Sequence, residues 1–192
     1  MISIKSEREI ELMRIAGSIV GDTHKYLQKY IKPGITTAEL DELAYNYIIS
    51  RNATPSFKGY EGFPGTICAS INEEVVHGIP GKTKLREGDI ISIDIGACYK
   101  GYHGDSAWTY PVGKISKQKQ DLLKHTEESL FAGLSVIKEG ARIGDIGYAV
   151  SSVANKYHLG VVKELVGHGV GTSVHEAPDV PNYGKQNNGP VL

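Results

Sequence analysis

The chain lacks the features of a secreted, membrane-bound or nucleic-acid-binding protein. Its 192 residues include only two cysteines, Cys68 and Cys98, which are too few for a disulfide framework. No apolar run is long enough to span a bilayer, and the first residues carry acidic side chains where a secretory signal needs a continuous apolar segment. The formal net charge is only -1. These absences predict a reduced, cytoplasmic protein with no membrane partner and no signal for direct nucleic-acid binding.

The composition is that of a folded protein with a sizeable core, because 40% of the residues are hydrophobic and 22% are charged. Capping boxes at Ser6 and Thr36 predict helices that run to about Tyr30 and Arg51. Apolar stripes predict two more helices, and β-branched runs predict strands. The later helices are expected over 116–138 and 143–157, and the strands over 67–76, 90–95, 103–109 and 161–166.

Two aspartates in one predicted hairpin are the strongest chemical signal. Asp94 interrupts a β-branched strand, and Asp105 lies on the return strand. A turn centred between Tyr99 and Lys100 would place the two carboxylates directly opposite each other, roughly 5 Å apart at Cβ. A shared proton or a bound metal ion would then neutralise them. A slip of one residue in the turn would place them on opposite faces, and a turn cap with an exposed neighbour is the alternative interpretation.

An internal repeat predicts a duplicated α/β unit. Residues 31–34 (IKPG) recur as residues 137–140 (IKEG), and a helix is predicted after each copy. A strand that ends in a His-Gly pair follows each helix, at His77 and at His168. The repeat therefore predicts two similar halves that share a central site.

Histidines and an aromatic loop are further candidates for the site. His168 lies among glycines that let other groups approach closely, whereas His77 alone is more often structural. The glycine- and aromatic-rich segment 57–68 is either a packed surface loop or a preformed pocket wall. Asp94, Asp105 and His168 together suit Mn, Fe, Co or Zn ions and the chemistry of two-metal hydrolysis. Three ligands are too few for two ions.

Three segments in this order closely resemble type I methionine aminopeptidases. They are FKGYEGFPGTICASINEEVVHGIP, DIISIDIGACYKGYHGDSAWTY and ELVGHGVGTSVHEAP. The resemblance runs from the first helix to the last residue. It implies an α/β (α+β) pita-bread fold, with an antiparallel sheet covered by helices and two pseudo-two-fold halves. The expected arrangement is one catalytic domain over 1–192, with halves at about 1–112 and 113–192.

The resemblance also implies roles for matching residues. Two divalent metal ions (Mn, Fe, Co or Zn) would be held by Asp94, by Asp105 as the bridging ligand, and by His168. His77 would bind the substrate near the scissile bond, and His175 would contact the peptide carbonyl. The implied methionine pocket consists of Phe57, Tyr60, Phe63, Cys68 and Val174. His103 shares a face with Asp105 by strand alternation, but the family pattern does not use it as a ligand.

The sequence departs from the family pattern in one respect. The family has two further glutamate ligands on strands downstream of the His175 segment, and one of them is also the general base. This sequence reaches Leu192 before either, so we expect an incomplete site with the last strands missing. Glu176 belongs to the His-Glu motif and is no substitute. The interpretations are a fragment of a full enzyme, a non-catalytic peptide-binding module, or a site completed by a partner chain.

The resemblance implies a hydrolase that removes N-terminal methionine from nascent proteins. Its expected partners are nascent peptide N-termini that begin with methionine, and association with the ribosome is left open. The related aminopeptidase P and prolidase enzymes are the runner-up, although they usually carry an extra N-terminal domain.

Overall fold

The computed structural model describes residues 2–192, which form two compact units. The first unit, here called the N-terminal unit, comprises Ser3–Ser116 and the segment Val170–His175. The second, the C-terminal unit, comprises Lys117–Gly169 and Glu176–Leu192 together with Ile2. The pseudo-two-fold symmetry that the sequence predicts between residues 1–112 and 113–192 stays a prediction.

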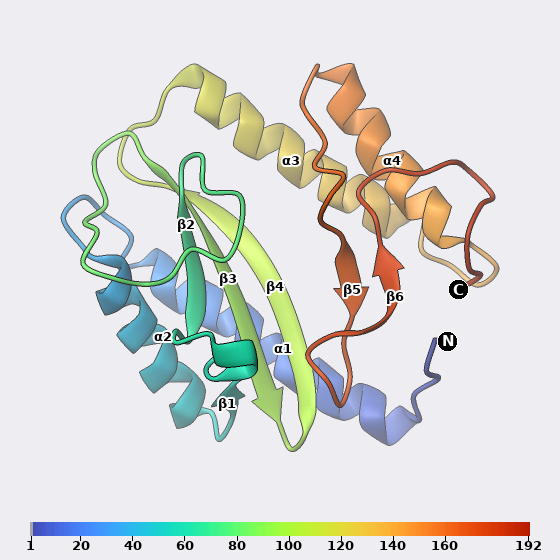
Figure 1. Ribbon diagram of the computed structural model, residues 1–192, viewed down its shortest axis with the longest axis horizontal. Coiled ribbons are helices and arrows are strands. Elements are labelled where there is room, and N and C mark those ends of the chain that lie inside the picture. Colours follow the sequence, from blue (N-terminus) through green and yellow to red (C-terminus); the bar gives the residue numbers. More distant parts are fainter. Residues whose placement is uncertain (1) are drawn as a thin grey trace. The chain divides into compact units, whose positions relative to one another are not determined.

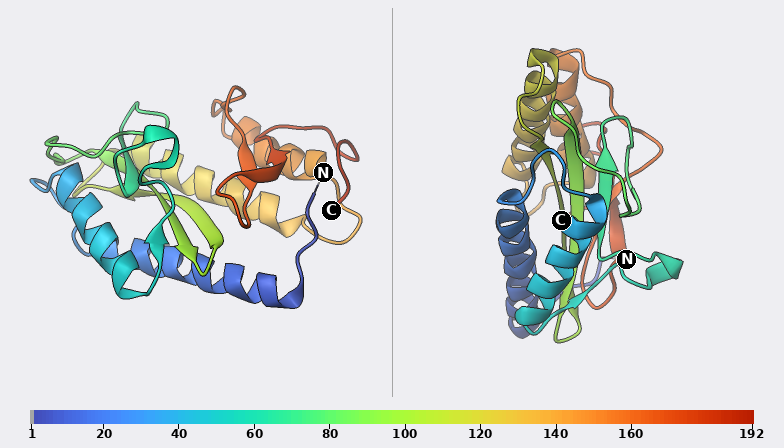
Figure 2. Two further views of the ribbon diagram at one scale, coloured as in Figure 1. Left: turned by 60° about the horizontal axis from the view of Figure 1, so that its bottom comes forward. Right: turned by 90° about the vertical axis from the view of Figure 1, so that its left-hand side faces the viewer.

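The N-terminal unit is an antiparallel sheet with two helices on one face (Figures 1 and 2). Strand β3 is central; β4 pairs with its whole length on one side, while β2 and the short β1 share the other side. The helices cover β3 residues that are fully buried, including Ile91, Ile93 and Ile95. The bounds are α1 (Glu7–Gln28), α2 (Thr37–Ser50), β1 (Thr54–Pro55), the 3-10 turn η1 (Tyr60–Gly62), β2 (Ile67–Ile71), β3 (Ile90–Tyr99) and β4 (Tyr102–Pro111).

Both predicted capping boxes are confirmed. The Ser6 hydroxyl accepts from the backbone N–H of Glu9, whose carboxylate accepts from the backbone N–H of Ser6, and Thr36 and Glu39 repeat the arrangement at α2. The predicted strand over 67–76 is wrong beyond Ile71, because Asn72 adopts a left-handed conformation with φ of 52° that ends β2.

The C-terminal unit consists of two packed helices and a two-stranded antiparallel sheet. Its elements are α3 (Lys117–Ser135), α4 (Ile143–Lys156), β5 (Gly167–Gly169) and β6 (Glu176–Val180). The strand predicted over 161–166 is wrong, because pairing begins only at Gly167. Large apolar side chains on α3 are partly exposed, among them Leu130, Phe131 and Leu134.

The repeat is visible in the helices. Helix α4 begins 143 − 37 = 106 residues after α2 and ends 156 − 50 = 106 residues after it. The pairing of His77 with His168 is wrong, however. Gly78 bonds back to Ala69 of β2, and Glu176 pairs with Gly169 of β5. In each copy a later residue returns to pair with the strand: Gly78 in the first copy and Glu176 in the second. The residue just before it is His77 in the first copy and His175 in the second, so His77 corresponds to His175 and not to His168.

Buried His24 is expected to make the N-terminal unit sensitive to acid. Its Nε2 lies 2.9 Å from the Ser106 carbonyl and its Nδ1 lies 3.0 Å from the Tyr110 hydroxyl. Because a carbonyl only accepts, Nε2 carries the proton and neutral Nδ1 accepts from the hydroxyl. Burial lowers the pKa of His24 below its usual value.

Since the unfolded chain takes up this proton more readily, His24 contributes stability above about pH 6.5 that is lost as the pH falls. We expect urea unfolding at pH 7, 6 and 5 to show a decline in the free energy of unfolding. The decline should be smaller in His24→Gln than in the parent protein. Equal declines would show that His24 does not cause the acid sensitivity.

Candidate active site

The two aspartates lie together on the sheet face that the helices leave uncovered. The turn is centred on Lys100 and Gly101, which have φ of 49° and 85°, one residue later than predicted. Asp105 therefore opposes Gly96, and Asp94 opposes Ala107. The expectation that a slip of one residue in the turn would place the carboxylates on opposite faces is wrong. Moving the turn centre by one residue shifts the register by two, so the carboxylates stay on one face as diagonal neighbours. Direct opposition was a wrong prediction, but the shared face is correct.

The carboxylates interact directly. A side-chain hydrogen bond joins Asp105 to Asp94, and burial together with the Asp94 charge raises the pKa of Asp105 to about 8. The pair therefore holds a proton at neutral pH, which is one of the two forms of neutralisation expected from the sequence. A divalent cation is the other, because it would replace that proton between two oxygen donors.

A small apolar cluster lies on the same face. Phe57, Cys68 and Val174 are buried there, and Phe63 packs against them. Gly96 makes room for this wall, since a Cβ at that position would lie 2.6 Å from the Phe57 ring. Cys68 opposes Asp94 across β2 and β3. The cluster and the carboxyl pair are therefore neighbours.

The Cys68 thiol is a packing group rather than a nucleophile. Burial is the main cause that raises its pKa to about 12, and the charges of Asp94 and Asp105 add to the effect. A thiolate is the reactive form of cysteine, so this side chain stays a neutral, polarizable wall of the cluster.

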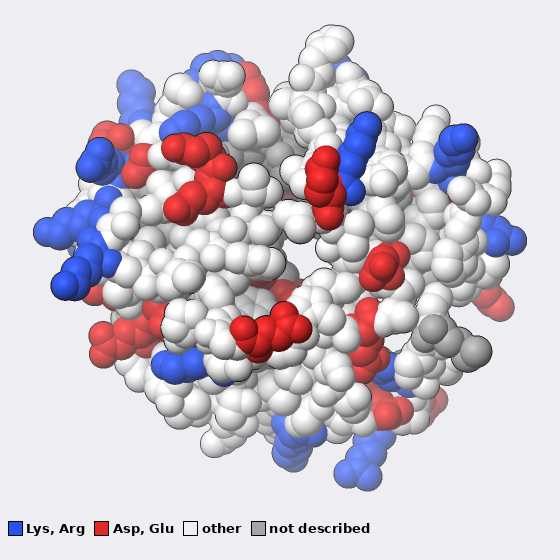
Figure 3. Space-filling view, viewed as in Figure 1, with Lys and Arg blue, Asp and Glu red and all other residues white. Residues whose placement is uncertain are grey.

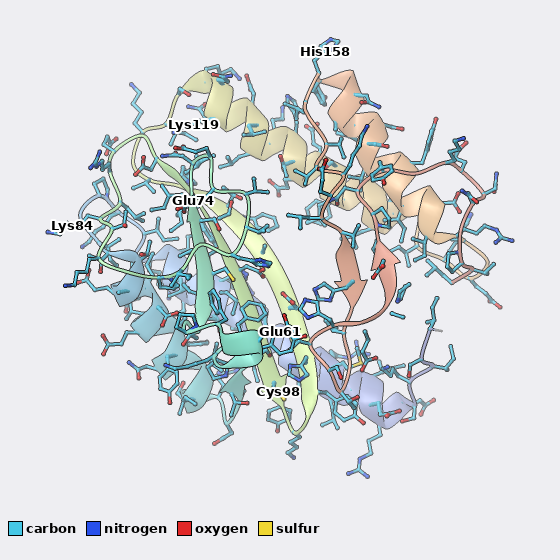
Figure 4. All side chains as sticks on the ribbon, viewed as in Figure 1. Glu61, Glu74, Lys84, Cys98, Lys119 and His158 are labelled. Atoms are coloured by element: carbon cyan, nitrogen blue, oxygen red, sulfur yellow. The ribbon has the colours of Figure 1, made fainter. Side chains whose placement is uncertain are left out.

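Tyr60 and His175 meet at the edge of this face. The Tyr60 hydroxyl lies 3.1 Å from His175 Nδ1, and the two ring centroids are 5.4 Å apart. Tyr60 is held in the η1 turn, where Gly59 and Glu61 have left-handed backbones. Figure 4 labels Glu61 on this turn. The contact leaves His175 Nε2 as the ring nitrogen directed away from Tyr60.

The other two predicted histidines have different surroundings. His77 is exposed and left-handed, with φ of 59°, beside β2. A Cβ on the following Gly78 would lie 2.4 Å from the Ala69 carbonyl oxygen, so the backbone there is held tightly. His168 is half-buried in β5 of the C-terminal unit, and its Nδ1 lies 2.9 Å from the Gly169 carbonyl oxygen. That His168 binds the metal ions together with Asp94 and Asp105 stays a prediction.

One supporting residue was not found by sequence reasoning. The Asp41 carboxylate on α2 accepts from the backbone N–H groups of Thr66 and Ile67, at 2.6 and 2.9 Å. These bonds fix the start of β2 and hence the place of Cys68. No local pattern signals a contact between residues 25 positions apart.

Over residues 2–192, the structure arranges no group of three or more histidine, cysteine, aspartate or glutamate side chains as a metal site. Within the same residues, no helix is long and apolar enough to cross a membrane. Figure 3 shows positive and negative side chains interspersed over one face of the molecule. The aspartate pair nevertheless fits a divalent cation, because two hard oxygen donors lie together and share a proton that a cation can displace.

Comparison with known proteins gives the class. The model of metallopeptidase family M24 matches residues 11–192. Methionine aminopeptidase 1 of Bacillus subtilis is 56% identical over 192 residues, which are 100% of this chain and 77% of that protein. The chain therefore belongs to metallopeptidase family M24.

Solved structures agree with this assignment. The crystal structure of methionine aminopeptidase from Rickettsia prowazekii matches with a TM-score of 0.98 and 39% identity, over 100% of this chain and 77% of that one. The enzyme from Thermotoga maritima matches with a TM-score of 0.98 and 41% identity, over 100% and 78%. Within the family, the chain is a homologue of the methionine aminopeptidases, and its fold is the mixed pita-bread type with helices and antiparallel sheets.

Proposed function

We propose that this protein removes methionine from the N-termini of nascent proteins by hydrolysis that depends on two divalent metal ions. One observation carries the proposal: an apolar, sulfur-lined cluster lies beside a proton-sharing carboxyl pair on the sheet face that α1 and α2 leave uncovered. An apolar pocket next to hard metal donors suits an apolar side chain joined to a polar bond that is to be cleaved.

The pocket chemistry favours methionine. Phe57 and Phe63 offer aromatic surface, and Cys68 offers a neutral thiol. A thioether is apolar and polarizable, and it packs well against aromatic rings. A charged side chain would lose its hydration among these apolar groups.

Asp94 and Asp105 would hold the metal ions together with His168 and the two downstream glutamates that the resemblance implies. When bound, the ions would supply Lewis acidity and activate water. The reaction breaks the C–N bond after methionine: the carbonyl carbon gains the hydroxyl of water, and the leaving amine takes the proton.

Two histidines would act on the peptide. His175, with Nδ1 turned to Tyr60, would donate from Nε2 to the carbonyl oxygen on which negative charge develops. His77, beside β2, would bind the substrate near the scissile bond. The second candidate function is a non-catalytic peptide-binding module, which uses the same pocket and needs no complete metal site.

Calorimetry and turnover on two versions of the protein separate these functions. The versions are the 192-residue chain and the same chain extended by the two glutamate-bearing strands that the resemblance implies. We expect the extended version to bind Mn²⁺ and to release methionine from Met-Ala-Ser. Peptide binding without turnover by the extended version would favour the binding module. Absence of both would contradict the proposal.

Tyr60→Phe should lower kcat/KM for Met-Ala-Ser about tenfold in the version that turns over, because the hydroxyl that orients His175 is lost while the ring remains. Steady-state kinetics measures the effect. Tyr45→Phe is the matched control, since exposed Tyr45 on α2 contacts Lys58 through its ring, which this change keeps. Equal kinetics for both variants would show that the Tyr60 hydroxyl does not matter.

A further inference from the structure

His103 contacts two segments that bring side chains to the apolar cluster, which is here called the pocket. One segment carries Phe57 and the other carries Val174, and these are called the two walls of the pocket. The Nδ1 of His103 lies 2.8 Å from the Ser56 hydroxyl oxygen, and Ser56 directly precedes Phe57. Its backbone N–H donates to the Gly171 carbonyl at 2.8 Å, and Gly171 begins the turn that leads to Val174 and His175. A single residue therefore links the two walls.

The first wall is held closely against the hairpin. Ser56 is only 9% exposed, and its backbone N–H donates to the Gly96 carbonyl at 2.9 Å. A Cβ at Gly96 would lie 2.8 Å from the Ser56 Cβ and 2.6 Å from the Phe57 ring. Because the hydroxyl is buried, loss of the His103 imidazole would leave a polar group without its partner at the base of the Phe57 wall.

The second wall is a short turn anchored at the same residue. Gly171 is buried, and its N–H donates to the Ser173 carbonyl at 3.1 Å. The turn delivers Val174 to Phe57 and Cys68. His103 itself lies opposite Cys98 near the end of the hairpin, where Figure 4 labels Cys98.

We propose that His103 is a positioning residue for the pocket: its imidazole fixes the Phe57 wall through Ser56, and its backbone fixes the Val174 wall through Gly171. It acts through these segments and does not touch the substrate. Its consequence for turnover rests on the proposed function, but its effect on the pocket walls does not.

The test uses the Cys68 thiol as a reporter that requires no turnover. The background is Cys98→Ser, which leaves Cys68 as the one cysteine of the chain. We expect His103→Ala and Ser56→Ala each to raise the rate of Cys68 labelling by a disulfide reagent about tenfold. The double variant should react no faster than either single variant, because both remove the same contact.

Two conservative variants give the matched comparison. His103→Asn places a polar atom at the position of Nδ1 and should restore slow labelling, whereas His103→Gln places its polar atoms one bond further out and should not. Hydrogen exchange should rise in segments 54–60 and 170–175 and stay unchanged in α1, which separates positioning from general destabilisation.

Unchanged labelling in both alanine variants would overturn the proposal, as would equal rescue by asparagine and glutamine. If the extended protein turns over, His103→Ala should raise KM more than it lowers kcat. A protein without any turnover would count against the proposed function alone, because the thiol and exchange measurements still decide the role of His103.

Discussion

Asp105→Asn in the extended version of the protein should lower the affinity for Mn²⁺ by at least about a hundredfold, a larger loss than that expected for residues that only support a ligand. In the parent protein the carboxyl pair holds a proton up to about pH 8, and a metal ion must displace it. Affinity should therefore rise with pH up to about 8 and then level off. Calorimetric titration at pH 6, 7 and 8 measures both effects.

The same substitution should change the stability of the metal-free protein. A carboxyl group whose folded pKa is raised stabilises the fold below its unfolded pKa of 3.8, and this contribution is lost as the pH rises through about 8. The metal-free parent should therefore lose more stability than Asp105→Asn between pH 4 and 8.

Asp121→Asn is the control for this prediction, because Asp121 is a carboxylate on α3 that pairs with Lys117. It should leave metal affinity unchanged. Parent-like Mn²⁺ affinity in Asp105→Asn would remove the carboxyl pair from the proposed metal site.

Gly104→Ala should lower the free energy of unfolding by about 2–4 kcal/mol. Helix α1 crosses β4 in backbone contact at this point, and a Cβ on Gly104 would lie 2.6 Å from Gly17 N and 2.7 Å from the Ala16 carbonyl carbon. Backbone atoms cannot rotate away as a side chain can, so α1 or β4 must shift. Urea unfolding measures the loss.

Gly21→Ala is the matched control within α1. A Cβ on Gly21 meets no atom within 4 Å, so alanine should raise stability by up to about 1 kcal/mol. If Gly104→Ala and Gly21→Ala were equally stable, the close approach of α1 and β4 would not constrain the fold. Since Gly104 precedes Asp105, Mn²⁺ binding should also weaken in Gly104→Ala.

Local chemistry made the helices predictable. The capping boxes at Ser6 and Thr36 each use residues three positions apart, so their signal lies within a short window of sequence. The strands were harder. The end of β2 depends on a left-handed Asn72, and the start of β5 depends on pairing with β6 rather than on the apolar run before it.

The site was predictable only in part for the same reason. Two aspartates that share a face of a hairpin still share it after the register shifts by an even number of residues. The observed shift is two residues, so the prediction of a shared face held although the predicted turn centre was wrong. The contacts of Tyr60 with His175 and of Ser56 with His103 join residues 115 and 47 positions apart. Strand alternation placed His103 on the correct face, but it could not reveal the serine that faces it.

The division of the chain also bears on its synthesis. Segment 170–175 belongs to the N-terminal unit, although residues 117–169 between it and Ser116 belong to the other unit. A ribosome that has released residues 1–116 has therefore produced the sheet, α1 and α2, but not Val174 or His175. During translation, the pocket of the N-terminal unit is complete only after residues 117–169 of the C-terminal unit have been synthesised. If the chain were expressed as two halves divided at residue 116, the second half would have to supply segment 170–175 to the first before the first could bind a peptide.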